Sequence, residues 1–298
     1  MTGILSLQLI GTPQVRLAGV ALRFQRRRSL ALLAYLVLTG REHSRDALAT
    51  LLAGEADPQA ARHTLRVALA ELREQLGDDL RITRQTVAFA PTRPVALDVA
   101  AVQAALASGN PTTIQAALDR TPCELLAGLS VSQAPDFENW LALERERWYN
   151  QRLQALQALL DHYERSGALA DGIAVARQLL AWAPWCEEAH GQLMRLLARA
   201  GQRAQALVQY QRCQAILTRE LGVAPLPATT ALYERLRTPM SALPSNLGAA
   251  RVLVGRASEQ ERLIALLAEP ECRLITVVGM GGIGKTALAR QVAGGPAP

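Results

Sequence analysis

At 298 residues, half of them hydrophobic, the chain is long enough for two domains or slightly more, each around a buried core. No apolar run approaches the roughly 18–20 residues that span a bilayer, and the four cysteines form no CxxC pair; this excludes membrane proteins and disulfide-stapled secreted proteins and favours a soluble, cytoplasmic protein. The net charge of +6 is concentrated in residues 1–97, where 13 arginines outnumber 8 acidic residues, so we expect a polyanionic partner there.

The first 97 residues predict strands at both of their ends. Residues 5–10, 15–17 and 21–24 are apolar runs of strand length, and Gly11-Thr12-Pro13 separates the first two. Residues 81–83 and 86–89 alternate as the two arms of a hairpin would, with a turn between them. The stretch between these strands predicts three helices.

Each of the three helices has recognisable start and stop residues. The limits are 27–39 with Gly40 as the stop, 45 to about 54 with Ser44 as the N-cap, and 58–76 with Asp57 as the N-cap, Pro58 at the first helical position and Gly77 as the stop. Strands, three helices and a terminal hairpin together predict a winged helix-turn-helix domain over residues 1–97.

The third helix has one apolar stripe and one basic face. At 100° per residue, the predicted buried stripe comprises Ala61, Leu65, Ala68, Leu69, Leu72 and Leu76. A second set falls together beside it: Gln59, Arg62, His63, Arg66 and Arg73. A face that gathers arginine suits the major groove of DNA, where arginine reads guanine edges and binds phosphate. The alternative is a merely solvated face.

Two further basic groups are candidate DNA contacts. Arg26, Arg27 and Arg28 open the first helix, where positive charge opposes the helix macrodipole and a DNA phosphate would relieve the conflict. Arg81 and Arg84 lie on the predicted hairpin, where they could enter a minor groove, touch phosphate or simply be polar surface.

Residues 98–238 predict a helical repeat array. Aligning this stretch on itself at an offset of 34 residues places Gly167 on Gly201 and Gly172 on Ala206. A period of 34 with small residues at helix crossings is typical of tetratricopeptide repeats, which bind protein surfaces. We expect the four tryptophans of this stretch to be core residues, and we find no catalytic constellation here. They are Trp140, Trp148, Trp182 and Trp185.

Residues 239–252 are rich in Pro, Ser and Gly and predict a linker, and residues 253–298 predict the beginning of a P-loop nucleotide-binding domain. An apolar run at 274–278 indicates a buried strand, and residues 287–292 indicate the helix that leaves the loop. The residues expected to bind nucleotide phosphates are Gly279, Gly281, Gly282, Ile283, Gly284, Lys285 and Thr286.

Catalysis is not expected of this domain. Thr286 would reach a Mg²⁺ ion held by ATP or ADP, but only twelve residues follow it, too few to supply a second metal ligand or to position water. We therefore expect nucleotide binding at most, no ATP hydrolysis, and no certain cofactor for this chain.

These parts, in this order, resemble the SARP type of bacterial transcriptional activator. In that family a response-regulator-type winged helix precedes a bacterial transcriptional activator domain. The motifs that carry the resemblance are residues 30–36 (LALLAYL), 44–49 (SRDALA), 65–73 (LRVALAELR), 137–140 (FENW), 193–197 (LMRLL) and 220–225 (ELGVAP). Residues 254–256 (VGR) and the P-loop are similar to the opening of the NB-ARC-like signalling ATPase that follows in larger members.

The resemblance implies a mainly α-helical protein with a small α+β domain that binds double-stranded promoter DNA and activates transcription. RNA polymerase or its sigma factor and a second copy of the chain are the implied protein partners. Two alternatives stay open: a nucleotide-switched signalling ATPase, and a tetratricopeptide adaptor that binds only protein. The arginines of the third helix count against the adaptor.

Overall fold

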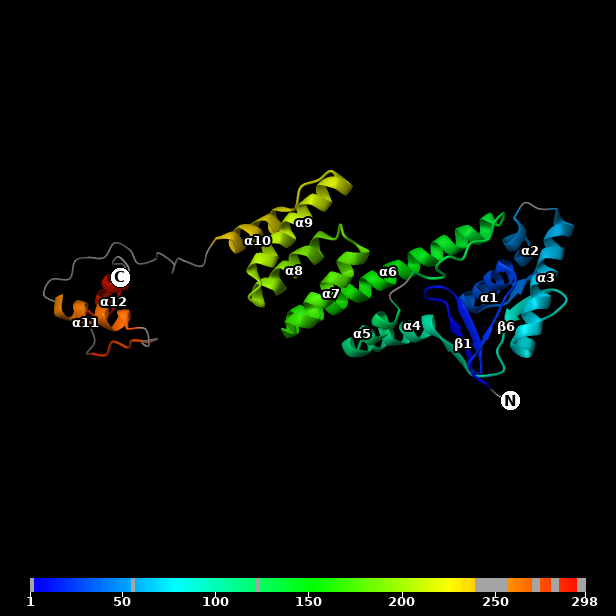
Figure 1. Cartoon of the computed structure of the whole chain (residues 1–298), viewed down its shortest axis with the longest axis horizontal. Helices are drawn as coiled ribbons and strands as arrows, with labels where there is room; N and C mark the ends of the chain where they lie inside the picture. The colour runs from blue at the N-terminus through cyan, green and yellow to red at the C-terminus, as the bar shows by residue number, and fades with distance from the viewer. Residues whose placement is uncertain are drawn as a thin grey trace. The chain divides into compact units, whose positions relative to one another are not determined.

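The computed structural model describes residues 3–54, 57–121, 124–238, 257–269, 274–279 and 284–293 (Figure 1). They belong to two compact units, residues 1–236 and residues 237–298. The predicted linker at 239–252 lies outside the described residues. The boundary that we propose at residue 97 therefore divides one compact unit.

A four-stranded sheet opens the first unit. It consists of β1 (Leu5–Gln8), β2 (Gln14–Leu17), β3 (Val20–Leu22) and β7 (Val95–Leu97), in the order β3-β2-β1-β7. The short turns between β1, β2 and β3 make those pairs antiparallel, whereas β7 returns from far along the chain and pairs with β1 in parallel. Leu5 and Leu7 are buried and Gln8 is exposed, which is the alternation that predicts the strand.

Three helices and a second small sheet complete the winged helix-turn-helix. The helices are α1 (Arg27–Thr39), α2 (Arg45–Ala53) and α3 (Pro58–Leu76), and the sheet β4 (His43–Ser44), β6 (Thr86–Phe89) and β5 (Leu80–Ile82), in that order. The predicted caps are confirmed: Ser44 Oγ accepts from the Ala47 amide, and Asp57 Oδ2 accepts from the amides of Gln59 and Ala60. A single 3₁₀ turn, η1 (Gly77–Asp79), links α3 to β5.

The rest of the first unit is the predicted helical array (Figure 1). Its helices are α4 (Asp98–Ser108), α5 (Pro111–Arg120), α6 (Pro135–Ser166), α7 (Leu169–Trp182), α8 (Glu187–Arg199), α9 (Arg203–Leu221) and α10 (Pro227–Arg237). From α6 to α9, each helix packs on the next. Gly167 and Gly201, which the 34-residue offset aligns, both have positive φ angles where a helix ends, of 79° and 75°. Gly172 lies so close to Leu196 that an added Cβ would be 3.0 Å from it.

Residues 124–134 depart from the prediction that this stretch is helical throughout. This segment is irregular because its backbone bonds to the turn after β1: the Leu126 amide donates to Leu9 O, and the Gly11 amide donates to Glu124 O. The Arg145 guanidinium then donates to the carbonyl oxygens of Leu125, Leu126 and Leu129. The segment thereby joins the array to the winged helix.

The expectation of four core tryptophans is wrong for one of them. Trp148 is buried, and Trp140 and Trp182 are half-buried in helix contacts, but the side chain of Trp185 is 48% exposed. Trp185 lies in the turn between α7 and α8, outside the packed helices. That a residue is a tryptophan does not show whether it lies in a helix contact or in an exposed turn.

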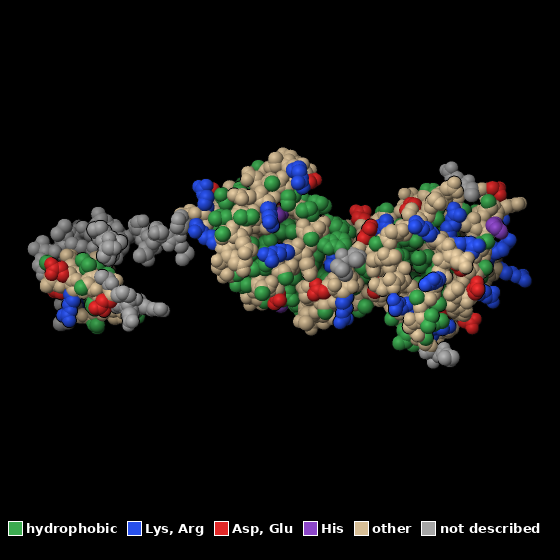
Figure 2. All heavy atoms as spheres, in the orientation of Figure 1, with side chains coloured by type: hydrophobic (Ala, Val, Ile, Leu, Met, Phe, Trp, Pro, Cys, Tyr) green, Lys and Arg blue, Asp and Glu red, His purple; other side chains and the backbone are tan. Residues whose placement is uncertain are grey.

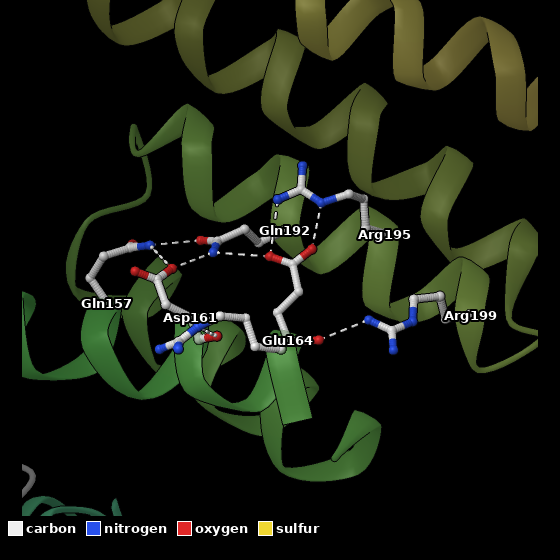
Figure 3. A network of polar contacts seen from close by, with 7 residues as sticks. Gln157, Asp161, Glu164, Gln192, Arg195 and Arg199 are labelled. Carbon is white, nitrogen blue, oxygen red and sulfur yellow. Dashed lines mark hydrogen bonds and ion pairs between the residues drawn. The ribbon is translucent and has the colours of Figure 1, made fainter. Parts of the chain in front are cut away.

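A polar network joins α6 to α8 (Figure 3). Both carboxylate oxygens of Glu164 accept from the Arg195 guanidinium, at 2.5 and 3.1 Å. Gln192 donates to Asp161 at 2.6 Å and accepts from Gln157 at 2.8 Å. On this face of the array Glu164 is therefore paired with Arg195, and Asp161 accepts from Gln157 and Gln192.

We expect the Glu164–Arg195 pair to make stability depend on pH in the acid range. The hydrogen bond from Arg195 holds the pKa of Glu164 below its ordinary value of 4.5. Because the folded-state pKa is the lower one, the stabilisation is present above pH 4.5 and is lost as the pH falls through the folded-state pKa. In thermal melts Glu164→Gln should be less stable than the wild type near neutral pH, and the difference should shrink in acid. A difference that stays constant on acidification would refute this role.

The second unit contains α11 (Ala257–Ala268) and α12 (Lys285–Ala293). The helix predicted to leave the P-loop is confirmed, but the strand predicted at 274–278 is not: these residues form no strand, and Leu274 and Val278 are 85% and 88% exposed. A strand needs a hydrogen-bonded neighbour, and no other described residue of this unit is in a strand.

Candidate nucleic-acid interface

The third helix presents the predicted basic face to solvent. Its six predicted apolar residues, 61, 65, 68, 69, 72 and 76, are all buried. The five predicted contact residues are all exposed: Gln59, Arg62, His63, Arg66 and Arg73. The core therefore holds one side of α3 and leaves the basic side accessible, as a helix that enters a DNA groove requires.

The arginines of this face differ in their intramolecular ion pairs and hydrogen bonds. Arg62 Nε lies 3.2 Å from Asp46 Oδ1, and the two side chains are 63% and 79% exposed. An ion pair this exposed contributes at most about 1 kcal/mol, so a DNA phosphate could replace the carboxylate. Arg66 is exposed and makes no hydrogen bond or ion pair within the described chain. Its guanidinium is available to a partner.

Glu71 changes the interpretation of the arginines that open α1. Its carboxylate is buried and accepts hydrogen bonds from the Gln25 amide and from Ser29 Oγ, at 2.5 and 2.6 Å, while Arg26 lies 3.9 Å away. The conflict between positive charge and the macrodipole is thus already relieved by an acid of the same protein, without any DNA phosphate. Glu71 thus offers an alternative to the macrodipole argument, and phosphate contact by these arginines stays a prediction that the exposure of Arg26 and Arg27 supports.

The three arginines are not equivalent. Arg26 and Arg27 are exposed, whereas Arg28 is half-buried and its guanidinium donates to Ser132 O at 3.1 Å. Arg28 therefore connects α1 to the irregular segment before α6. This contact gives Arg28 a structural role that its place in an arginine run does not indicate.

A basic groove lies between α1, α3 and that irregular segment. Its volume is about 640 Å³, and it is lined by residues 26–28 of α1, residues 63, 64, 67 and 68 of α3, and residues 130–132. Figure 2 shows several basic side chains on this end of the first unit. The groove places residues 26–28 of α1 beside His63 of the basic face of α3. The sequence alone does not reveal that these residues are neighbours.

The hairpin β5–β6 carries the remaining candidate DNA contacts, Arg81 and Arg84. Thr83 Oγ1 accepts from the Thr86 amide at 2.8 Å and so holds the turn. Arg84 is exposed at the turn, while Arg81 lies 3.7 Å from Glu42 in an exposed ion pair. The hairpin thus presents Arg84 without an intramolecular ion pair in the described chain.

The nucleotide-binding candidates are described only in part. Lys285 and Thr286 begin α12, and the Lys285 ammonium donates to Gly279 O at 2.6 Å. Gly284 precedes the helix with a φ of 91°, which favours glycine. Gly281, Gly282 and Ile283 lie outside the described residues. A pocket of about 680 Å³ adjoins Lys285, Gly279 and Leu263 of α11.

The described residues contain no cluster of three or more His, Cys, Asp or Glu side chains that could hold a metal ion. Among the described helices, none is long and apolar enough to cross a membrane.

Comparison with known proteins places these parts in families. Residues 92–237 match the bacterial transcriptional activator domain, and residues 256–295 match the NB-ARC domain. The chain is 28% identical to the regulatory protein AfsR of Streptomyces griseus over 291 residues and 29% identical to AfsR of Streptomyces coelicolor over 302 residues. Each alignment covers 88% of this chain, but the chain spans only 29% and 30% of those proteins.

A solved structure shares the fold. Mycobacterium tuberculosis EmbR, in complex with a low affinity phosphopeptide, superposes with a TM-score of 0.57 at 23% identity, over 78% of this chain and 64% of that one. This likeness shows a shared fold. The domain match over residues 92–237 and the sequence relatives confirm the resemblance to SARP-type bacterial transcriptional activators.

Proposed function

We propose that this chain is a transcriptional activator that binds double-stranded promoter DNA through its winged helix. In this proposal α3 lies in the major groove with His63 and Arg66 at base edges, while Arg26 and Arg27 contact backbone phosphates. Arg84 of the hairpin lies over a phosphate or in the adjacent minor groove. A protein that acts on promoter DNA works in the bacterial cytoplasm, and this location is part of the proposal.

One observation carries the proposal: the exposed face of α3 is basic, and the groove beside it is basic as well. Arg62 has only a solvent-exposed partner, and Arg66 has none in the described chain. The 640 Å³ groove extends this positive surface to the first turn of α1. Such a continuous surface matches a polyanion with regularly spaced phosphates.

Selection from a random duplex library tests the function. The purified protein should enrich a recurring sequence over several rounds, and a duplex that carries this sequence should bind more tightly than a scrambled one. Enrichment of no common sequence, together with equal affinity for all duplexes, would favour the adaptor alternative.

Replacing Arg27 by alanine should weaken the binding of every duplex to the same degree. Arg27 is exposed at the start of α1, where it would contact phosphate rather than a base. Loss of one phosphate contact should reduce the slope of log affinity against log salt concentration by about one unit. Fluorescence anisotropy titrations at several salt concentrations measure both effects, with Arg235→Ala on α10 as the control. Loss of discrimination between sequences would instead place Arg27 at a base.

For the array we propose a protein-binding role, with RNA polymerase or its sigma factor, or a second copy of the chain, as partner. The support is the packing of α6 to α9 as a tetratricopeptide-like array, an architecture that binds protein surfaces.

For the second unit we propose nucleotide binding by Lys285 and Thr286. The chemistry of the described residues fits: an ammonium and a hydroxyl stand at the N-terminus of a nine-residue helix. A bound ATP or ADP would bring the phosphates and the Mg²⁺ that such groups bind. A fluorescent ADP analogue should bind the wild type and lose binding with Lys285→Ala. Unchanged binding by this variant would exclude the P-loop as the site.

A further inference from the structure

The array contains a second groove, away from the winged helix, which we call the α7–α9 groove. Helices α7 and α9 each pack on α8, and the space between them is a groove of about 610 Å³. Arg177 and Leu180 come from α7, Leu193 from α8, and Val208 and Arg212 from α9. Figure 2 shows hydrophobic and basic side chains together over this part of the array.

The walls of this groove offer accessible apolar surface. The side chain of Val208 is 46% exposed, and Leu180 and Ile216 are half-buried. Leu193 is buried beneath them and belongs to the floor. Exposed apolar side chains of this kind are costly in water, and a partner that covered them would gain their burial.

The charge of the groove has one sign. Arg177 and Arg212 are exposed on its two walls, and no acidic residue lines it. Arg177 donates to Gln205 Oε1 at 3.4 Å, and Arg212 has no hydrogen bond or ion pair within the described chain. This contrasts with the face between α6 and α8, where Glu164 holds Arg195.

His190 adds no charge to the groove. Its Nε2 lies 2.9 Å from Pro184 O, and its Nδ1 lies 2.6 Å from Gln209 Nε2. Burial lowers the pKa of His190, which favours the neutral ring. With the two ring nitrogens engaged, His190 shapes the wall, and the arginines remain the cations that a ligand would meet.

We propose that the α7–α9 groove binds a short helical segment of a partner protein that carries apolar side chains on one face and carboxylates beside them. Apolar side chains would cover Val208 and Leu180, and the carboxylates would pair with Arg177 and Arg212. The apolar walls favour a protein segment over nucleic acid, which offers phosphates but no aliphatic surface. The inference rests on the proposed protein-binding role of the array and is independent of DNA binding by α3.

A displayed library of random 16-residue peptides tests this. The full chain should enrich peptides with acidic residues next to apolar residues at a spacing of three or four. The Arg177→Glu, Arg212→Glu double variant should lose that enrichment, and its affinity for the best selected peptide should fall by about tenfold or more in anisotropy titrations. Arg235→Glu, which makes the same substitution at one exposed arginine of α10, should leave the affinity unchanged.

Three results would overturn the proposal. The first is enrichment of peptides without acidic residues, and the second is equal binding by the double variant and the wild type. The third is a fall in molar mass for the double variant in light scattering, which would assign the groove to a second copy of the chain. DNA affinity, measured on the same samples, should be unchanged in the double variant, so a failure of this inference is distinguishable from a failure of DNA binding.

Discussion

Replacing Glu71 by alanine should lower the free energy of unfolding by about 3 kcal/mol. The carboxylate accepts from the Gln25 amide and the Ser29 hydroxyl, and Ser29 is fully buried. Without Glu71 these donors lose their acceptor in a place that the core shields from water. The start of α1, which has no side-chain N-cap of its own, then loses the carboxylate that binds the residue before its N-cap and the hydroxyl of its first turn.

Urea unfolding measures this effect, with two matched variants. Glu71→Gln keeps an acceptor of the same shape and should cost less than the alanine change, because one amide oxygen still accepts. Glu74→Ala alters an exposed acid three residues along the same helix and should change stability by at most about 0.5 kcal/mol. If Glu71→Ala were no more destabilising than Glu74→Ala, the stabilising role of the buried Glu71 carboxylate would be wrong.

The sequence predicts most of the winged helix because its elements are locally encoded. Ser44 and Asp57 cap α2 and α3, Gly40 and Gly77 end α1 and α3, and the apolar stripe of α3 follows from its period alone. The arginine face beside that stripe follows for the same reason. In the array, the 34-residue offset aligns Gly167 with Gly201, and the structure places both where a helix ends.

What the sequence does not reveal depends on contacts between distant residues. Asp98 Oδ2 accepts from the amides of Leu9 and Ile10 at 2.8 and 2.7 Å. These hydrogen bonds connect the start of α4 to the residues that follow β1. The helical period places Glu71 away from the basic face but cannot show that its carboxylate binds the Gln25 amide and the Ser29 hydroxyl. The sequence likewise does not show that Arg28 donates to the carbonyl oxygen of Ser132, 104 residues away.

Replacing Arg66 by alanine should abolish most of the sequence preference for DNA. Arg66 is exposed in the middle of α3, and its neighbour Leu65 is buried and fixes the rotation of the helix. A bidentate arginine–guanine contact contributes about 1–3 kcal/mol of discrimination, which is roughly a 5- to 150-fold change in relative affinity. Because α3 keeps its core and its cap, the variant should remain folded.

The control for this variant is Arg73→Ala, which removes the same charge two turns nearer the C-terminal end of α3. The N-terminal part of a recognition helix usually meets base edges. We therefore expect Arg73→Ala to weaken the selected and the scrambled duplex by a similar factor and to preserve their ratio. Thermal melting of both variants establishes that the comparison is made between folded proteins.

The most direct measurement is a titration of the wild type and Arg66→Ala against the selected duplex and a scrambled duplex of equal length, at several salt concentrations. We predict that the ratio of the two affinities falls by about 5- to 150-fold in the variant, while affinity for the scrambled duplex changes far less. An unchanged ratio, with both duplexes bound as by the wild type, would contradict the assignment of α3 as the helix that reads DNA.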